Sequence, residues 1–125
     1  MLKVLVVDDS KAMRMIVKRI LRQIDIGEHS IVEAEDGAEG LKQVDEHNPD
    51  LILSDWNMPN MNGIEFLGKV REENQRVKFG FVTTEGSEKM RNLATDTGAN
   101  FMITKPFTPE SFEKSLMPVL AKAGM

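Results

Sequence analysis

Five short runs of Val, Ile, Leu and Phe alternate along the chain with segments whose apolar residues recur every three or four positions. The apolar runs cover residues 3–7, 30–34, 51–54, 78–83 and 101–104. Nearly continuous apolar runs of this length are typical of strands buried on both faces, as in a parallel sheet covered by helices. Asp, Gly, Asn or Pro stands at each change of period, where turns are expected. The pattern predicts five strand–helix units.

The segments that follow the runs predict five helices, because their apolar residues fall on one helical face. These residues are Met13, Ile16, Val17, Ile20, Leu21 and Ile24; Ala38, Leu41 and Val44; Ile64, Phe66, Leu67 and Val70; Met90, Leu93 and Ala94; and Phe112, Leu116, Val119 and Leu120. Asp9 or Ser10 can cap the first helix. Poor helix formers flank the fourth, which we expect to be the most mobile. Pro118 should make the fifth helix kink or end near Met117.

Five such units joined by short links predict an α/β fold with right-handed crossovers. Its core would be a doubly wound, five-stranded parallel sheet with helices on both faces. At 125 residues the chain has the usual length of one domain, and no linker or low-complexity tract divides it. We therefore expect one domain.

Composition and charge exclude several classes of function. The formal net charge is −4 and the basic residues are dispersed, which disfavours nucleic-acid binding because phosphate contacts rely on a positive stripe. The absence of cysteine excludes disulfides, thiolate catalysis and thiolate metal sites. Asp8 and Asp9 interrupt the first apolar run, and no run approaches the roughly 18 residues of a membrane helix. We expect a cytoplasmic protein with no membrane partner.

Polar residues stand at the ends of four of the predicted strands. Asp8 and Asp9 follow the first strand, Asp55 follows the third, Thr83 ends the fourth, and Lys105 follows the fifth. The carboxyl ends of parallel strands lie along one edge of a sheet, where ligands bind. Three carboxylates, a hydroxyl and an ammonium should therefore share one pocket.

Three clustered carboxylates repel one another at neutral pH, so a cation is needed to hold them together. Oxygen ligands without nearby His or Cys favour Mg²⁺, Mn²⁺ or Ca²⁺ over zinc. Mg²⁺ fits best, because it binds one or two carboxylates and completes its shell with waters or a phosphate oxygen. A carboxylate beside such an ion can attack a phosphoryl group, while Lys105 neutralises its oxygens and Thr83 donates a hydrogen bond.

Four motifs at these strand ends resemble the response-regulator receiver family. They are V-L-V-V-D-D-S, S-D-W-N-M-P-N-M-N-G, V-T-T-E and T-K-P-F, each at the matching strand end and in the matching order. The resemblance covers the whole chain and is greatest to the chemotaxis members. It implies the flavodoxin-like strand order 2-1-3-4-5, and a receiver domain over residues 1–125 with no output domain.

The resemblance also implies roles for individual residues. Asp55 would be the phosphoacceptor, and Asp8 and Asp9 would hold Mg²⁺ together with Asp55 and the backbone carbonyl of Asn57. Asn57 and Glu85 stand two residues beyond the acceptor and the threonine, where the family tunes the access of water to the acyl phosphate. Glu85 is also compatible with an exposed loop acid of no special role.

Thr83 would be the switch hydroxyl, and the side chain of Lys105 would pair with the phosphoryl group. The peptide bond between Lys105 and Pro106 would be cis. Many receivers have Tyr or Phe three residues before this lysine, whereas this chain has Met102. Phe101 is adjacent but should face the other side of the strand. A methionine is flexible enough to change rotamer in a comparable way.

The implied function is that of a signalling protein and not of an enzyme. The implied partners are a histidine kinase, a flagellar motor switch protein or a phosphotransfer partner, and a phosphatase; we expect a monomer. Met90 and Met102 should lie near the output face formed by the fourth helix, fifth strand and fifth helix. The alternative to motor control is a phosphate sink or an intermediate in a phosphorelay, which would need the same pocket.

Three other classes of protein share parts of this pattern. A haloacid-dehalogenase-type phosphatase also forms an aspartyl phosphate, but its nucleophile opens a D-x-D motif after the first strand, where this chain has Asp8-Asp9-Ser10. A flavodoxin needs hydroxyls and glycines in its first loop, where two aspartates would repel its phosphate. A pseudo-receiver that only binds partners has little reason to keep the full acidic set.

Overall fold

The computed structural model describes residues 1–84 and 86–122, and its five strands form one parallel sheet in the order β2-β1-β3-β4-β5. The strands are β1 (Leu2–Val7), β2 (His29–Ala34), β3 (Leu51–Ser54), β4 (Lys78–Thr83) and β5 (Phe101–Thr104). Every neighbouring pair is parallel. Both the predicted strand positions and the predicted order are confirmed.

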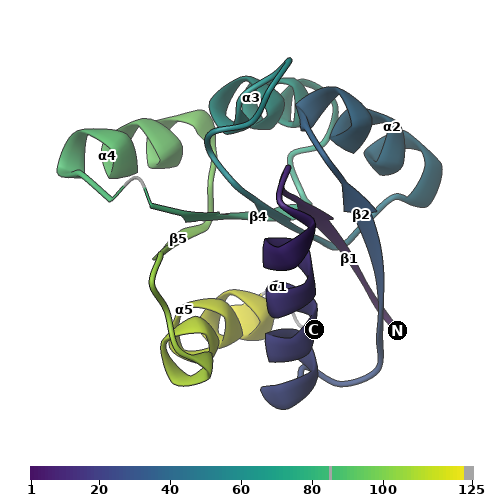
Figure 1. Ribbon diagram of the computed structural model, residues 1–125. Coiled ribbons are helices and arrows are strands. Elements are labelled where there is room, and N and C mark those ends of the chain that lie inside the picture. Colours follow the sequence, from purple (N-terminus) through teal and green to yellow (C-terminus); the bar gives the residue numbers. More distant parts are fainter. Residues whose placement is uncertain (85, 123–125) are drawn as a thin grey trace.

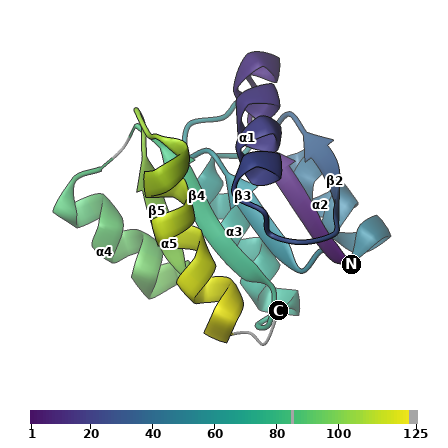
Figure 2. The ribbon, with the colours of Figure 1, turned by 90° about the horizontal axis from the view of Figure 1, so that it is seen from below.

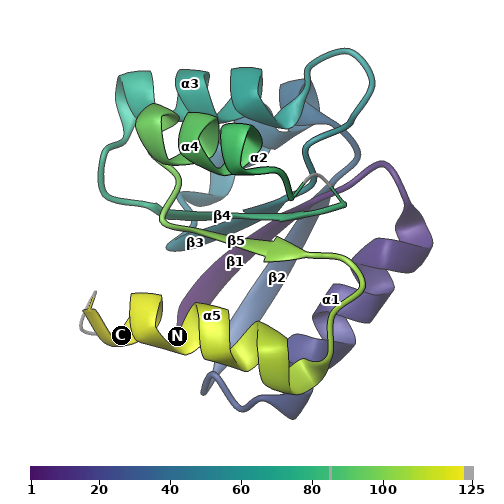
Figure 3. The same ribbon diagram turned by 90° about the vertical axis from the view of Figure 1, so that its left-hand side faces the viewer.

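Five helices cover the two faces of the sheet, as the sequence predicted. They are α1 (Lys11–Gln23), α2 (Gly37–His47), α3 (Gly63–Glu73), α4 (Glu88–Thr97) and α5 (Pro109–Lys122). Figure 1 shows the ribbon, and Figure 3 shows α2, α3 and α4 on one face with α1 and α5 on the other. In Figure 2, α1 and α5 lie in front of the strands while α2 and α3 lie behind them.

The apolar strands form two cores, one on each side of the sheet. Val4 and Val6 of β1 pack in the cluster that α1 and α5 cover, whereas Leu5 and Val7 pack in the cluster under α2, α3 and α4. Successive side chains of a strand point to opposite faces. This double burial explains why the strands are continuous apolar runs and not alternating ones.

Side-chain caps fix where the helices begin. The Oγ of Ser10 accepts the N–H of Met13 at 3.2 Å, and Oδ1 of Asp36 accepts the N–H of Glu39 at 2.8 Å. Each bond satisfies one of the N–H groups that the first turn of a helix leaves unpaired. Because Ser10 caps α1, Asp8 and Asp9 lie in the short loop between β1 and that helix.

Two sequence expectations about buried helix positions need correction, and one about the end of a helix is narrowed. Ile16 and Leu93 are 41% and 44% exposed, because α1 and α4 turn toward the sheet through neighbouring positions that include Val17 and Ala94. The fifth helix was expected to kink or end near Met117; α5 does not end there but continues through Pro118 to Lys122. Pro118 is exposed, so water can reach the carbonyl that its missing N–H leaves unpaired.

Within residues 1–84 and 86–122, none of the helices combines the length and the apolar character that crossing a bilayer requires.

Candidate functional site

The backbone carries the predicted site residues to one edge of the sheet. The N–H of Asp8 donates to the carbonyl of Ala34 at 3.0 Å, and the N–H of Asp55 donates to the carbonyl of Val7 at 2.9 Å. The N–H of Lys105 bonds to the carbonyl of the last residue of β4 at 2.8 Å. Each bond extends the parallel ladder one step beyond a strand. The three residues therefore start from adjacent positions at the carboxyl edge.

The side chains of these residues converge on one another. Carboxylate oxygens of Asp8, Asp9 and Asp55 all lie within 4.8 Å of one another. The Lys105 ammonium lies 3.5 Å from Oδ2 of Asp8 and 3.6 Å from Oδ2 of Asp55. The structure thus brings together the four charged groups that the sequence placed at the ends of three different strands.

Backbone N–H groups orient two of the carboxylates. Oδ1 of Asp8 accepts the N–H of Ser10 at 2.9 Å, and Oδ1 of Asp55 accepts the N–H of Trp56 at 2.7 Å. The other oxygen of each aspartate, Oδ2, is the one that lies near Lys105. In each carboxylate, therefore, the backbone holds Oδ1 in place and Oδ2 faces the Lys105 ammonium.

Burial and like charge act together on Asp8 at the end of β1. Burial is the largest cause that raises the pKa of Asp8 above its ordinary value, and the charges of Asp55 and Asp9 raise it further. The Ser10 N–H and the Lys105 ammonium oppose this shift. A second, divalent cation would relieve the same repulsion. The donor set suits Mg²⁺, because it consists of hard carboxylate oxygens with no His or Cys among them.

Thr83 lies at the last position of β4 and is fully buried. It pairs in register with Thr104 of β5, which directly precedes Lys105. The Lys105–Pro106 bond is cis, as the resemblance to the receiver family implied. The threonine and the lysine therefore occupy neighbouring strands at the same edge.

The other residues that the sequence analysis singled out are Asn57, Glu85, Met102 and Phe101. Asn57 is exposed, two residues beyond Asp55, and its role as a ligand through its carbonyl stays a prediction. Glu85 lies outside the described residues. Met102 is partly buried against the core under α2, α3 and α4, whereas Phe101 packs in the opposite core, so the expected division of β5 is confirmed.

Sequence reasoning missed Arg14, which contacts the backbone of Asp8, and its partner Glu33. Arg14 is buried on α1, where its Nη1 donates to the Asp8 carbonyl at 2.6 Å and its Nε to Glu33 Oε1 at 2.9 Å. Position 14 lies three residues before Val17 on the buried face of α1. The signal that could have identified Arg14 is a charged residue on the helical face whose other residues are apolar.

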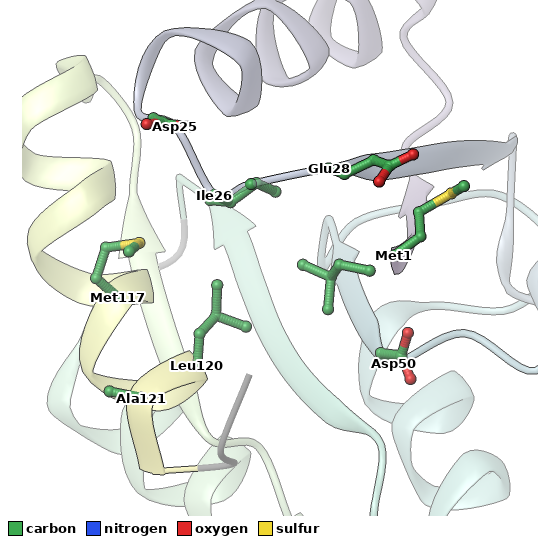
Figure 4. A pocket seen from close by; sticks show the side chains of 10 residues that line it. Met1, Asp25, Ile26, Glu28, Asp50, Met117, Leu120 and Ala121 are labelled. Carbon is green, nitrogen blue, oxygen red and sulfur yellow. The ribbon is translucent and has the colours of Figure 1, made fainter.

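A separate cavity of about 640 Å³ lies at the other end of the sheet. Its walls include Leu2, Ile26 and Leu120, and the carboxylates of Glu28 and Asp50 also line it (Figure 4). Leu2 starts β1 and Leu120 lies in α5, while Ile26, Glu28 and Asp50 precede β2 or β3. The cavity is therefore remote from the acidic cluster, which gathers at the carboxyl ends of the strands.

A doubly wound 2-1-3-4-5 sheet with an acidic cluster and a lysine at its carboxyl edge defines the receiver class of signalling domain. The chain matches the family model of the response regulator receiver domain over residues 4–117, and it belongs to this family.

Its relatives include chemotaxis proteins of similar length. The chain is 38% identical over 122 residues to the chemotaxis protein CheY1 of Helicobacter pylori, a match that covers 95% of this chain and 97% of that protein. It is 39% identical over 122 residues to the chemotaxis protein CheY homolog of Campylobacter jejuni, covering 95% and 92% of the two chains.

Solved structures agree with this relationship. Chemotaxis response regulator CheY4 of Vibrio cholerae superposes with a TM-score of 0.81 at 34% identity, over 98% of both chains. A receiver domain protein from Clostridium thermocellum, at 22% identity, shares the fold with a TM-score of 0.85 over 98% of this chain and 96% of that one. The chain is a CheY-like receiver domain.

Proposed function

We propose that the chain accepts a phosphoryl group on Asp55 from the phosphohistidine of a histidine kinase, in a Mg²⁺-dependent reaction. Phosphorylation then switches a surface that binds another protein. The observation that carries this proposal is the shared position of Lys105 between Oδ2 of Asp8 and Oδ2 of Asp55, at 3.5 and 3.6 Å. This arrangement supplies a carboxylate that can attack phosphorus and a positive charge that can neutralise the phosphoryl oxygens.

Four groups of the chain would hold Mg²⁺: the carboxylates of Asp8, Asp9 and Asp55 and the backbone carbonyl of Asn57. When bound, the ion would supply charge neutralisation for the phosphoryl oxygens. The clustering of the three carboxylates within 4.8 Å supports this assignment.

In the transfer step, one oxygen of Asp55 forms a P–O bond while the P–N bond of the donor histidine breaks. The electron pair of the broken bond stays on the imidazole nitrogen, which takes a proton from water. We assign the attack to Oδ2, because Oδ1 already accepts the N–H of Trp56. Lys105 then pairs with a phosphoryl oxygen and Thr83 donates its hydroxyl to another. Asp55 acts as a phosphoacceptor and not as the nucleophile of a turnover enzyme.

The switch would run from Thr83 to the surface of α4, β5 and α5. Thr83 is buried at the end of β4, directly before the segment that leads into α4. A shift of its hydroxyl toward the phosphoryl group would move that segment. Met90 and Met102, both partly buried in the same core, would adjust their rotamers as it moved. Asn57 and Glu85 would tune the access of water to the acyl phosphate.

Motor control is the output that the relatives favour, because two of them are chemotaxis proteins that match this chain over almost all of their length. The proposed partners are a chemotaxis histidine kinase, a flagellar motor switch protein and a phosphatase, all met in the cytoplasm. A pull-down with and without beryllofluoride, which mimics the acyl phosphate, tests this output. Capture of a motor switch protein only with beryllofluoride supports motor control, whereas capture of a phosphotransfer protein supports a relay.

The reaction itself is tested through Trp56, the only tryptophan, which is 5% exposed and whose backbone N–H donates to Oδ1 of the proposed acceptor. Mg²⁺ followed by acetyl phosphate should change its emission in two steps. The Asp55→Asn variant should lose the second step. A wild-type signal that neither addition alters would contradict the proposal.

A further inference from the structure

Arg14 is a buried arginine that contacts the loop carrying Asp8 and Asp9. Its Nη1 donates to the carbonyl oxygen of Asp8 at 2.6 Å, and its Nε donates to Oε1 of Glu33 at 2.9 Å. Arg14 is only 8% exposed. A buried guanidinium is tolerated when its charge is matched and its donors are filled. Glu33 supplies the opposite charge, and the Asp8 carbonyl receives one of the donors.

Glu33 is itself anchored from a second side. The Lys18 ammonium lies 2.9 Å from Oε2 of Glu33, so the carboxylate on β2 is held by two cations of α1, one on each oxygen. The contacts form a continuous path from Lys18 through Glu33 and Arg14 to the backbone of Asp8. The direction of the guanidinium is therefore set by β2 and α1 and not by the loop that it contacts.

The Asp8 carbonyl is the point through which this path acts on the acidic cluster. The N–H of Asp8 bonds to the carbonyl of Ala34, and its Oδ1 accepts the N–H of Ser10. The carbonyl of Asp8 and the N–H of Asp9 belong to one rigid peptide plane. Holding the carbonyl therefore sets the direction in which the chain leaves toward Asp9, whose own side chain is exposed.

We propose that Arg14 is a positioning residue: by holding the Asp8 carbonyl from its anchor on Glu33, it fixes the loop that presents Asp8 and Asp9 to Mg²⁺. This inference rests on the proposed function, which assigns those two carboxylates to the ion. Residues that orient the ligands of a metal typically change its affinity by about 10–100-fold when they are replaced.

A planar guanidinium suits this role better than any other side chain. Its Nε and Nη1 donors are separated by a fixed angle, so Glu33 and the Asp8 carbonyl can be bonded at the same time. The ammonium of a lysine is a compact point charge on a flexible stem. Lysine at position 14 keeps the positive charge but cannot reproduce the bonds to both Glu33 and the Asp8 carbonyl. The Arg14→Lys variant therefore separates the effect of hydrogen-bond geometry on Mg²⁺ binding from the effect of charge.

The test is the Mg²⁺ affinity of Arg14→Lys, measured by titration of Trp56 emission. We expect the dissociation constant for Mg²⁺ to rise about tenfold or more. At saturating Mg²⁺ the rate of phosphorylation by acetyl phosphate should return toward that of the wild type, because Arg14 touches neither the acceptor nor the phosphoryl group. Urea unfolding of each variant reports how much stability the substitution removes.

Arg71→Lys is the matched control. Arg71 is likewise 8% exposed, and it donates to the carbonyls of Gly98 and Asn74, both at 3.0 Å, at the end of the fold remote from the acidic cluster. Its replacement should lower stability to a similar degree and leave the Mg²⁺ affinity unchanged. This control removes a buried guanidinium without disturbing the loop at Asp8.

The outcomes separate this inference from the proposed function. Weaker Mg²⁺ binding in Arg14→Lys alone supports the positioning role, whereas affinities within about twofold of the wild type, or equal losses in both variants, overturn it. A wild type that does not bind Mg²⁺ overturns the proposed function and this inference together. If Arg14→Lys does not fold, Glu33→Leu replaces it, because leucine has no oxygen to accept the Arg14 Nε–H. An unchanged Mg²⁺ affinity in that variant overturns the positioning role.

Discussion

The ammonium of Lys105 lies 3.6 Å from Oδ2 of Asp55, and the two side chains are only 16% and 13% exposed. At this depth the ion pair is poorly screened by water, so the lysine charge acts strongly on whatever the carboxylate binds. The same ammonium is 3.5 Å from Asp8. Lys105 therefore acts in two opposing ways: its charge stabilises the three clustered carboxylates, and it competes with a divalent cation for them.

Replacement of Lys105 by methionine tests both effects in one variant. Without the ammonium, the phosphoryl oxygens lose a charged partner, and we expect the rate of phosphorylation by acetyl phosphate to fall about 100-fold. Mg²⁺ should bind more tightly than to the wild type, because a like charge has left the site. Titration of Trp56 emission and stopped-flow phosphorylation measure the two quantities. Parallel losses of rate and Mg²⁺ affinity would contradict this role.

Removal of the hydroxyl of Thr83 should separate phosphorylation from output. In Thr83→Ala the acceptor, the lysine and the acidic cluster remain. We therefore expect the rate of phosphorylation to stay within about threefold of the wild type, a much smaller loss than that expected when the Lys105 ammonium is removed. The difference in partner binding with and without beryllofluoride should disappear, because the hydroxyl no longer shifts toward the phosphoryl group. Calorimetric titration of the captured partner checks this. Full retention of the beryllofluoride effect would exclude Thr83 as the switch.

Gly63 should be intolerant of any side chain, because α3 begins directly against the backbone of the acceptor. A Cβ at this position would lie 2.4 Å from the Asp55 carbonyl oxygen and 2.6 Å from the ring of Phe81. We expect Gly63→Ala to lower the free energy of unfolding by about 1–3 kcal/mol, as overpacking does, and to weaken the fluorescence response at Trp56.

Gly68→Ala, in the same helix, is the control for that substitution. Nothing lies within 4 Å of the position where its Cβ would be built. Alanine there should raise the free energy of unfolding by about 0.5–1 kcal/mol, because glycine is entropically unfavourable in a helix. Urea unfolding compares the two. Similar changes in the free energy of unfolding of both variants would show that the contact between a Cβ at position 63 and the Asp55 carbonyl does not destabilise the fold.

Glu33 should contribute stability that depends on pH. Its hydrogen bond from Lys18 is the largest cause that lowers its pKa below the ordinary value of 4.5, and Arg14 lowers it further. A carboxyl with a lowered pKa stabilises the fold fully above its unfolded value. That contribution is lost as the pH falls through the folded value. The loss therefore begins near pH 4.5 and continues below it.

Glu33→Gln should therefore destabilise the protein at pH 7 but not in acid. Because the side chain is 34% exposed, solvent screening limits the expected difference in unfolding free energy to about 1 kcal/mol. Urea unfolding from pH 7 to pH 3 should show the wild type and variant converging. Glu72→Gln, at an exposed position of α3, should differ little from the wild type in unfolding free energy at pH 7. A difference at Glu33 that grows in acid would contradict the assigned sign.

The sequence was sufficient for the strands and for the convergence of charge, because both follow from patterns that a parallel sheet imposes. Double burial makes each strand an apolar run, and the carboxyl edge gathers whatever follows those runs, which here is Asp8, Asp55 and Lys105. Ile16 was misplaced because apolar spacing defines a helical face only to within about one residue. Arg14 was missed because its burial depends on Glu33, a partner 19 residues away on another element.

The central claim is that Asp8, Asp9 and Asp55 hold a divalent ion so that Asp55 can carry a phosphoryl group. The most direct measurement is a crystal structure of the protein with Mg²⁺ and beryllofluoride. The account predicts beryllium bonded to the carboxylate of Asp55, a fluoride near the Lys105 ammonium, and Mg²⁺ among the three acids. Beryllofluoride absent from Asp55, with the three carboxylates turned apart and no ion between them, would contradict it.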